Sequence, residues 1–302
     1  MTLEQLRTLL AIVDTGSFSA AAERLQRSQP AVSVSLKELE NETGARLLER
    51  RRAGALLTRE GREFLPQVRQ ALSLLDGARQ RIAESRDSGS GRLVIATTDT
   101  LATYRLPAIV AAFKRRFPRI NLLIHSKQSR IAAQMVAEGE ADLGYLPFEA
   151  IGPELIAVEL GRTRELFVHD TKHAPRRGRR VVSVHELRHT QLILLSDDTL
   201  TRQVLDKVFS KVGATLQPAT EAISIEVIKA MVKSGVGCAL LPDMSIEADR
   251  KAGRVITAIV REISPRPWGA CIRRSAPPGR TVNAVLDLSR TICGVNPARR
   301  VL

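Results

Sequence analysis

The sequence predicts a multidomain chain with three parts: a small helix-rich N-terminal domain, a long linking helix, and an α/β domain made of two lobes. Its 302 residues exceed one ordinary domain. Residues 1–60 show apolar residues at helical spacing, and residues 65–82 continue a single apolar stripe. From Arg92 onward, short apolar strands alternate with helices, which is typical of an α/β domain.

Composition narrows the range of functions. Hydrophobic residues make up 44% of the chain, enough for packed cores, whereas aromatics make up only 3%. Recognition of nucleic acid by stacking bases on rings is therefore not expected to be the main activity. The N-terminus contains Glu4 and no unbroken apolar run, so it resembles neither a signal peptide nor a membrane span. We expect a cytoplasmic protein without a membrane partner.

The net charge of +14 is unevenly distributed. Residues 1–60 carry nine Lys or Arg and eight Asp or Glu, a net of +1. The excess lies downstream, in APRRGRR at 174–180 and in the last forty residues. For each of these basic runs a solvated surface is the favoured interpretation over a nucleic-acid site.

The first two helices are predicted by their spacing and their caps. Leu3, Leu6 and Leu9 give a one-sided helix that ends between Asp14 and Gly16. Ser17 or Ser19 can cap the next helix, in which a run of alanines allows close packing.

A third helix follows, with Ser28 as its cap and Pro30 in its first turn. Val32, Leu36 and Leu39 form the predicted buried stripe. The short polar side chains left over suit a DNA major groove, and they are Gln29, Ser33, Ser35 and Lys37. Taken alone, the segment equally fits a three-helix bundle with a solvated face.

Residues 50–57 predict a wing, with three arginines at a turn before a short strand. Arg50, Arg51 and Arg52 would contact phosphates, which fixes register without reading sequence. Thr58 and Gly61 then open the long helix, whose stripe consists of Leu65, Val68, Leu72, Leu75, Ala78 and Ile82. Such a stripe favours pairing with a second chain over packing on its own domain, and Pro66 can bend its first turns.

The second half predicts parallel sheets with crossover helices, because strands such as LVIATT and INLLIH alternate with amphipathic helices. The chain leaves the first lobe and later returns to it, as in periplasmic solute-binding proteins. Residues 97–100 follow a strand, where ligands commonly bind; a simple helix cap explains only one or two of these hydroxyls. The predicted cleft also receives residues 126–129, 196–201 and Ser224.

Catalysis and metal binding are not indicated. The five histidines lack metal-ligand spacing, and no acid, base and nucleophile grouping is present. Cys238, Cys271 and Cys293 are far apart and are interpreted as inert thiols. We therefore expect neither an enzyme nor a metal or cofactor.

The run SFSAAAERLQRSQPAVSVSLKELENETGARLLERR, followed by LLTREG and the long helix, strongly resembles the winged helix-turn-helix of LysR-type transcriptional regulators. The segments GEADLGYLP and VKSGVGCALLP resemble the effector-binding domain of the same family. The resemblance implies a homodimer or homotetramer that binds double-stranded promoter DNA, responds to a small-molecule effector and influences RNA polymerase. The alternative is a DNA-architectural protein without ligand response.

The expected domains are a DNA-binding domain at 1–58, a linker helix at 59–87 and an effector domain at 92–302. Lobe 1 is expected at about 92–162 and 267–302, and lobe 2 at about 163–266. Carried over by position, the DNA-binding residues are Gln29, Pro30, Ser33, Val34, Ser35, Lys37, Arg50, Arg51 and Arg52. Val34 stands where many members have a basic residue and can offer only apolar contact.

Within the family, TTDTLATYRLP and HSKQSRIAAQMV look closest to the CysB-like branch. Asp99, Leu101 and Pro147 depart from that branch and place sulfate itself in doubt, so a sulfonate, another organic acid or a ligand with an amine stay open. The expected effector-binding residues are Thr98, Asp99, Thr100, Gln128, Ser129, Ser196, Thr199, Thr201 and Ser224.

Overall fold

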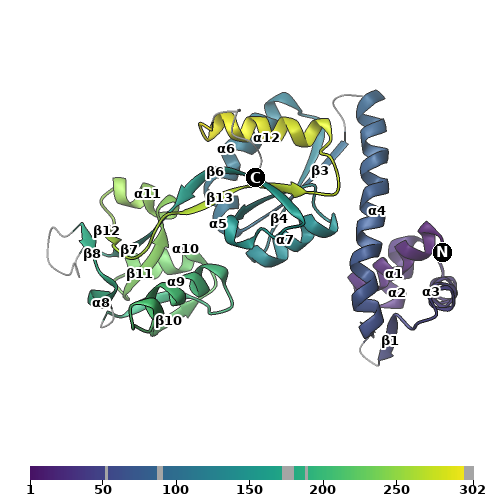
Figure 1. Cartoon of the computed structure of the whole chain (residues 1–302), viewed down its shortest axis with the longest axis horizontal. Helices are drawn as coiled ribbons and strands as arrows, with labels where there is room; N and C mark the ends of the chain where they lie inside the picture. The colour runs from purple at the N-terminus through teal and green to yellow at the C-terminus, as the bar shows by residue number, and fades with distance from the viewer. Residues whose placement is uncertain (52–53, 87–90, 172–179, 188–189, 296–302) are drawn as a thin grey trace. The chain divides into compact units, whose positions relative to one another are not determined.

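The computed structural model describes residues 1–51, 54–86, 91–171, 180–187 and 190–295. The chain forms two compact units, one ending with the long helix α4 and one beginning with strand β3. The predicted architecture is confirmed: a winged helix-turn-helix, a long helix and a two-lobed α/β domain (Figure 1). Arg52, most of the basic run at 174–180, the linker residues 88–90, His173 and His189 lie outside the described residues.

The N-terminal unit consists of four helices and a two-stranded hairpin. Their bounds are α1 Leu3–Thr15, α2 Phe18–Leu25, α3 Gln29–Thr43, β1 Leu48–Arg51, β2 Gly54–Leu57 and α4 Arg59–Arg86. The predicted caps are confirmed for Ser17 and Ser28, whose hydroxyls accept from the backbone N–H groups of Ala20 and Ala31. Gly16 and Gly44 end α1 and α3 in the left-handed conformation that favours glycine.

One apolar core holds these helices together, with Leu9, Ile12 and Val32 fully buried at its centre. The beginning of α4 belongs to this core, because Val68 and Leu72 are buried in it. Farther along α4, Leu75 and Ile82 are 42% and 60% exposed. The predicted stripe therefore has two parts, one that packs on the unit itself and one that is uncovered within the chain.

Lobe 1 of the effector domain is built on a five-stranded sheet in the order β4-β3-β5-β13-β6. These strands are β3 Gly91–Thr97, β4 Ile120–Ser126, β5 Leu143–Pro147, β6 Leu155–Thr163 and β13 Arg266–Arg273. The helices of the lobe are α5 Asp99–Tyr104, α6 Leu106–Arg116, α7 Ser129–Glu138, the single turn η1 Phe148–Ala150 and α12 Arg280–Ile292. Phe113 of α6 and Val285 of α12 share one core cluster with the sheet.

Lobe 2 is built on a six-stranded sheet in the order β10-β9-β11-β7-β12-β8. Its strands are β7 Glu165–His169, β8 Val181–Val182, β9 Leu192–Leu195, β10 Pro218–Ala222, β11 Cys238–Pro242 and β12 Ile256–Val260. Its helices are α8 Val184–Leu187, α9 Leu200–Lys211, α10 Ile225–Lys233 and α11 Asp243–Lys251.

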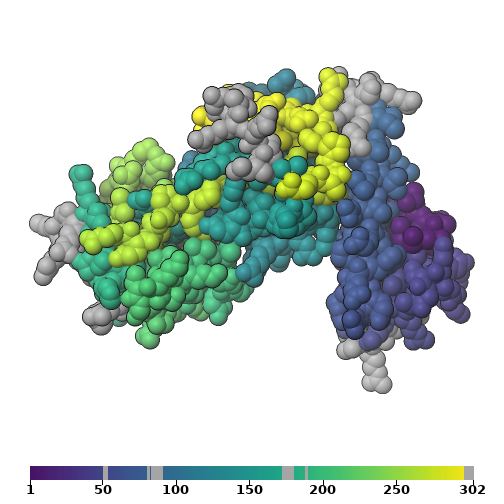
Figure 2. Space-filling model, viewed as in Figure 1, coloured from purple at the N-terminus to yellow at the C-terminus, as the bar shows by residue number. Residues whose placement is uncertain are grey.

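Parallel pairs are present as predicted, for example β3 with β4 and β9 with β10, but both sheets are mixed and not parallel throughout. Strand β13 runs antiparallel to both β5 and β6, and β7 runs antiparallel to both β11 and β12. These antiparallel pairs arise because the chain leaves lobe 1 through β6 and returns through β13 (Figure 1). In the space-filling view the yellow C-terminal segment reaches from one lobe toward the other (Figure 2).

Candidate functional site

The exposed face of α3 is the first candidate surface. Gln29, Pro30, Val34 and Lys37 are exposed, and Ser33 is half-buried. Val34 is 55% exposed, which is unusual for an apolar side chain held on a well-packed helix. Positions 30, 33, 34 and 37 lie on one side of α3, as expected from helical spacing.

The placement of Ser35 on this face was wrong. Ser35 is buried, and its hydroxyl donates a hydrogen bond of 3.3 Å to the hydroxyl of Thr8 in α1. Position 35 lies three residues after Val32 and four before Leu39, so it belongs to the buried stripe. The helical spacing of position 35 therefore indicates burial, although serine is a polar residue.

A groove of about 920 Å³ runs beside the exposed face of α3. Ser33, Val34 and Lys37 line it, together with Asn41 and Arg46, which sequence reasoning did not single out. Asn41 lies four residues after Lys37, one turn farther along the same face. The groove thus offers a cation, a hydroxyl, an amide and an apolar side chain along one helix.

The hairpin is fixed next to α3 by a carboxylate. Glu40 Oε1 accepts hydrogen bonds from the backbone N–H groups of Leu47, at 2.8 Å, and Leu48, at 3.1 Å. Gly54 allows close approach, since a side chain there would collide with the backbone of Gly16. Arg50 and Arg51 lie in β1, but their side chains, like all of Arg52, are outside the described residues.

The second candidate site is a cavity of about 510 Å³ between the two lobes. Eight of the nine predicted effector residues line it: Thr98, Asp99, Thr100, Gln128, Ser129, Thr199, Thr201 and Ser224. Ser196 is not among the lining residues; its backbone oxygen accepts from the Thr199 hydroxyl at 2.7 Å. The eight residues come from the starts of helices α5, α7, α9 and α10.

Several of these hydroxyls also have local roles. Thr98 and Thr199 cap α5 and α9, accepting from the backbone N–H groups of Leu101 and Arg202. Ser224 stands at the N-cap of α10 but makes no capping bond through its side chain. The simple-cap interpretation therefore accounts for Thr98 but not for Asp99 and Thr100, which line the cavity without capping α5.

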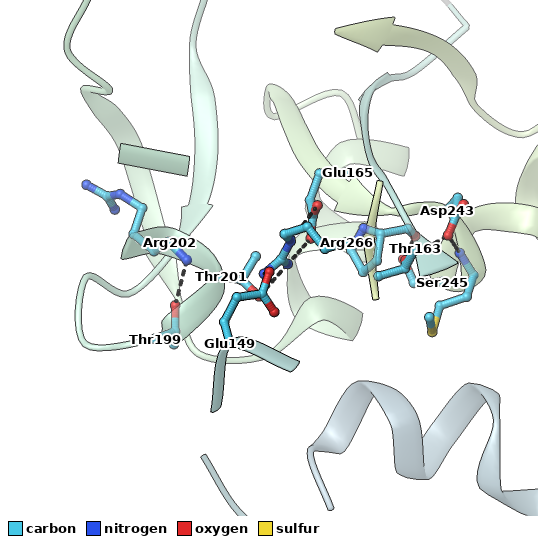
Figure 3. Close-up of polar contacts among 11 residues, drawn as sticks. Glu149, Thr163, Glu165, Thr199, Thr201, Arg202, Asp243, Ser245 and Arg266 are labelled. Atoms are coloured by element: carbon cyan, nitrogen blue, oxygen red, sulfur yellow. Dashed lines mark hydrogen bonds and ion pairs between the residues drawn. The ribbon is translucent and has the colours of Figure 1, made fainter. Parts of the chain in front are cut away.

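Sequence reasoning missed the main charged pair of the cavity. Arg266 lies at the start of β13, and its guanidinium contacts Glu165 at 2.5 Å and Glu149 at 3.4 Å (Figure 3). Burial opposes the charge of Arg266, but the two carboxylates outweigh it and raise the pKa of this arginine. Glu165 is 1% exposed, and a charged residue opening the apolar stretch ELFVH is the signal that could have indicated a buried ion pair.

Polar contacts join the lobes around the cavity. Gln128 donates to Asp198 at 2.7 Å, and Arg130 donates to Gln203 at 2.8 Å. Elsewhere Lys229 of α10 donates to the hydroxyl of Tyr104 at 2.9 Å. Each of these three bonds joins one residue of lobe 1 to one residue of lobe 2.

Within the described ranges, no group of three potential ligands is placed to hold a metal ion. The helices of these same ranges include none that is long and apolar enough to cross a bilayer.

Comparison with known proteins identifies the family. The model of the LysR substrate binding domain matches residues 86–293, and that of the bacterial regulatory helix-turn-helix protein, lysR family, matches residues 3–62. The chain belongs to the LysR family of transcriptional regulators. Among LysR-family relatives, an uncharacterized HTH-type regulator, YvbU of Bacillus subtilis, is 28% identical over 89% of both chains. A probable RuBisCO transcriptional regulator of Porphyra purpurea is 30% identical over 87% of this chain and 84% of its own.

Solved LysR-family structures share the fold. Full-length OxyR of Pseudomonas aeruginosa aligns with a TM-score of 0.75 at 24% identity, covering 96% of this chain and 95% of its own. Full-length CbnR in complex with its target DNA aligns with a TM-score of 0.65 at 21% identity, covering 96% and 99%. The homologues are transcriptional regulators and not enzymes, so the chain is a DNA-binding LysR-type regulator whose second domain is of the effector-binding kind.

Proposed function

We propose that the exposed face of α3 reads promoter DNA, with Lys37 contacting a phosphate and Ser33 and Val34 facing base edges. The groove beside Ser33, Val34 and Lys37 supports this assignment. Gln29 and Pro30 begin the same face, and the arginines at 50–52 would hold the wing on the backbone. Ser35 is left out, because its hydroxyl is buried against Thr8.

DNA binding can be tested with the fragment immediately upstream of the protein's own reading frame. Fluorescence anisotropy across a salt series should show tighter binding to this fragment than to a scrambled one. Lys37→Ala should weaken binding about tenfold on both fragments and make the salt dependence shallower, as expected for one lost phosphate contact. Equal, steeply salt-dependent binding of both fragments would favour the DNA-architectural alternative.

We propose that the effector is a small organic acid, bound in the cavity between the lobes. The proposal is carried by the eight predicted residues that line one cavity from the starts of four helices, where backbone N–H groups favour an anion. Arg266 is already paired with Glu165 and Glu149, and the other two charged residues that line the cavity, Lys127 and Asp99, have opposite charges. This balance favours a singly charged acid group, such as a carboxylate or sulfonate, over sulfate.

The remainder of the ligand would lie against the apolar lining residues, which include Ile223, Met244 and Trp268. A sulfonate would agree with the CysB-like resemblance, and the branch within the family stays a prediction. A thermal-shift screen of small carboxylates and sulfonates should find a compound that stabilises the chain, by about 2.7 kcal/mol at a hundredfold excess over Kd.

Thr100→Val serves as the test variant, since it keeps the size of the side chain and removes a hydroxyl. It should lose the thermal shift while binding DNA as the parent does. An unchanged shift would place the effector elsewhere.

We further propose a homodimer or homotetramer, paired through the uncovered part of α4, that acts on RNA polymerase in the cytoplasm. The proposed division is a DNA-binding domain at 1–58, a linker helix at 59–87 and an effector domain at 92–302, with lobe 1 at about 92–162 and 267–302. The exposed side chains of Leu75 and Ile82 support the pairing. Effector binding would change how far the lobes close, and thereby the spacing of the paired DNA-binding domains.

A further inference from the structure

A second groove, of about 940 Å³, lies on the effector domain beside the chain segment that leaves lobe 1. Five arginines and two carboxylates are among the residues that line it. The arginines are Arg105, Arg162, Arg164, Arg180 and Arg250. None of these five lines the cavity proposed for the effector.

The groove and the effector cavity lie on opposite faces of the crossing segment. Strand β6 ends at Thr163 and β7 begins at Glu165, so consecutive side chains alternate between two faces. Arg162 and Arg164 line the groove, whereas Glu165 lines the cavity. Thr163 lines both, and its hydroxyl donates to Asp243 at 2.8 Å (Figure 3).

The two carboxylates of the groove are engaged within the chain. Asp243 accepts from the Thr163 hydroxyl at 2.8 Å and from the backbone N–H of Met244 at 2.7 Å. Glu247 pairs with Lys251 at 2.6 Å on the exposed side of α11, and the pKa of Glu247 is lowered mainly by Lys251 and to a smaller extent by the charges of Arg105 and Arg250. Neither carboxylate therefore forms an ion pair with an arginine of the groove among the described residues.

Four of the five guanidinium groups have no ion pair and no hydrogen bond to any residue the structure describes: those of Arg105, Arg164, Arg180 and Arg250. Arg162 pairs with Glu159 at 2.9 Å, and Arg105 lies over the ring of Trp268 at 5.9 Å. The groove thus gathers more positive charge than its carboxylates balance. Arginine suits the bidentate recognition of phosphate and carboxylate oxygens, and several in one concave site match a ligand with several negative charges.

We propose that this groove binds a small polyphosphate anion, the terminal phosphates of a nucleotide or a short inorganic polyphosphate. Arg105 and Arg162 belong to lobe 1, whereas Arg180 and Arg250 belong to lobe 2. A ligand held by both sets bridges the lobes on the face opposite the effector cavity. The five arginines lie outside the effector cavity, whereas Thr163 and Met244 line both, so the groove adds a second input beside the effector cavity of the same domain.

Isothermal titration of the full chain with inorganic triphosphate, at constant ionic strength, tests this proposal. One site per chain is expected, and Arg164→Gln combined with Arg250→Gln should weaken binding at least about tenfold. A matched control, Arg115→Gln with Lys207→Gln, removes two exposed charges elsewhere on the domain and should leave the affinity unchanged. Thr100→Val should also leave it unchanged, which separates this site from the effector cavity.

A parallel titration with adenosine triphosphate distinguishes a nucleotide ligand from an inorganic polyphosphate. Binding of the nucleotide at least as tight as that of triphosphate indicates a nucleotide, and tighter binding of triphosphate indicates an inorganic chain. The proposal is overturned if triphosphate does not bind, or if the control pair weakens binding as much as the groove pair. It is also overturned if the groove pair weakens binding of a DNA duplex while triphosphate binding is unchanged.

Discussion

Ser35 shows how one side chain decides which residues of α3 can reach DNA. Its hydroxyl is buried against Thr8, whereas Lys37, two positions later, is exposed. We expect Ser35→Ala to change DNA affinity by less than about twofold and to lower the free energy of unfolding by about 1 kcal/mol at most. Ser35→Lys should destabilise the domain much more, since it would bury an unpaired charge.

Thermal denaturation and DNA titration of the two Ser35 variants beside Lys37→Ala would check this. A large loss of DNA affinity in a folded Ser35→Ala protein would contradict the buried placement.

The cysteines are chemically quiet in the folded chain. Burial, helped by the nearby carboxylate of Asp170, raises the pKa of Cys238 to about 11, and burial raises the pKa of Cys271 to about 12. At pH 8 both are protonated, so labelling by a disulfide reagent should be at least about a hundredfold slower than in denaturant.

The raised pKa values of Cys238 and Cys271 also make the stability of the fold depend on pH. Unfolded thiols ionise near pH 9, before the folded ones, so the free energy of unfolding should be unaffected at neutral pH and fall between about pH 9 and 12. Rapid native labelling of Cys271 would refute this assignment.

Among the elements, α4 has two distinct roles along its length. Its first turns complete the N-terminal core through Val68 and Leu72, whereas Leu75 is 42% exposed. We expect Leu75→Glu to lower the molar mass in sedimentation equilibrium, because it places a charge in the apolar stripe through which we propose that two chains pair. Gln67→Glu adds the same charge at an exposed position of α4 and is the matched control. An unchanged molar mass for Leu75→Glu would exclude pairing at this position.

For the effector domain as a whole, the ion pairs of Arg266 connect elements of both lobes. Glu165 belongs to lobe 2 and is 1% exposed, and Glu149 follows β5 of lobe 1. We expect Glu165→Ala to lower the free energy of unfolding by about 3–5 kcal/mol, because a buried guanidinium loses its main partner.

Glu149→Ala removes a longer contact of 3.4 Å to a carboxylate that is 30% exposed, and should cost about 1 kcal/mol or less. Urea unfolding of both variants measures the difference. Equal losses of unfolding free energy in the two variants would mean that burial of the carboxylate does not determine how much each ion pair stabilises the domain.

The sequence predicts those features that are determined by neighbouring residues, and it does not predict those that depend on distant segments. Ser28 and Pro30 begin α3 through contacts within one turn, so their roles were readable from spacing. The direction of β13 depends on a return from another lobe, and Arg266 meets Glu165 from 101 positions away. No local pattern contains such pairings, which is why the polar cavity lining was predicted and its ion pair was not.

The position of β13 between β5 and β6 also sets an order for synthesis on the ribosome. Every strand of lobe 2 has been made by Val260, whereas the sheet of lobe 1 still lacks an interior strand until Arg273 has been added. Lobe 2 can therefore fold while the chain is growing, and lobe 1 must wait for α12 and the final strand. A chain truncated between Val260 and Arg266 would contain every strand of lobe 2, attached to an open, aggregation-prone lobe 1 that lacks β13.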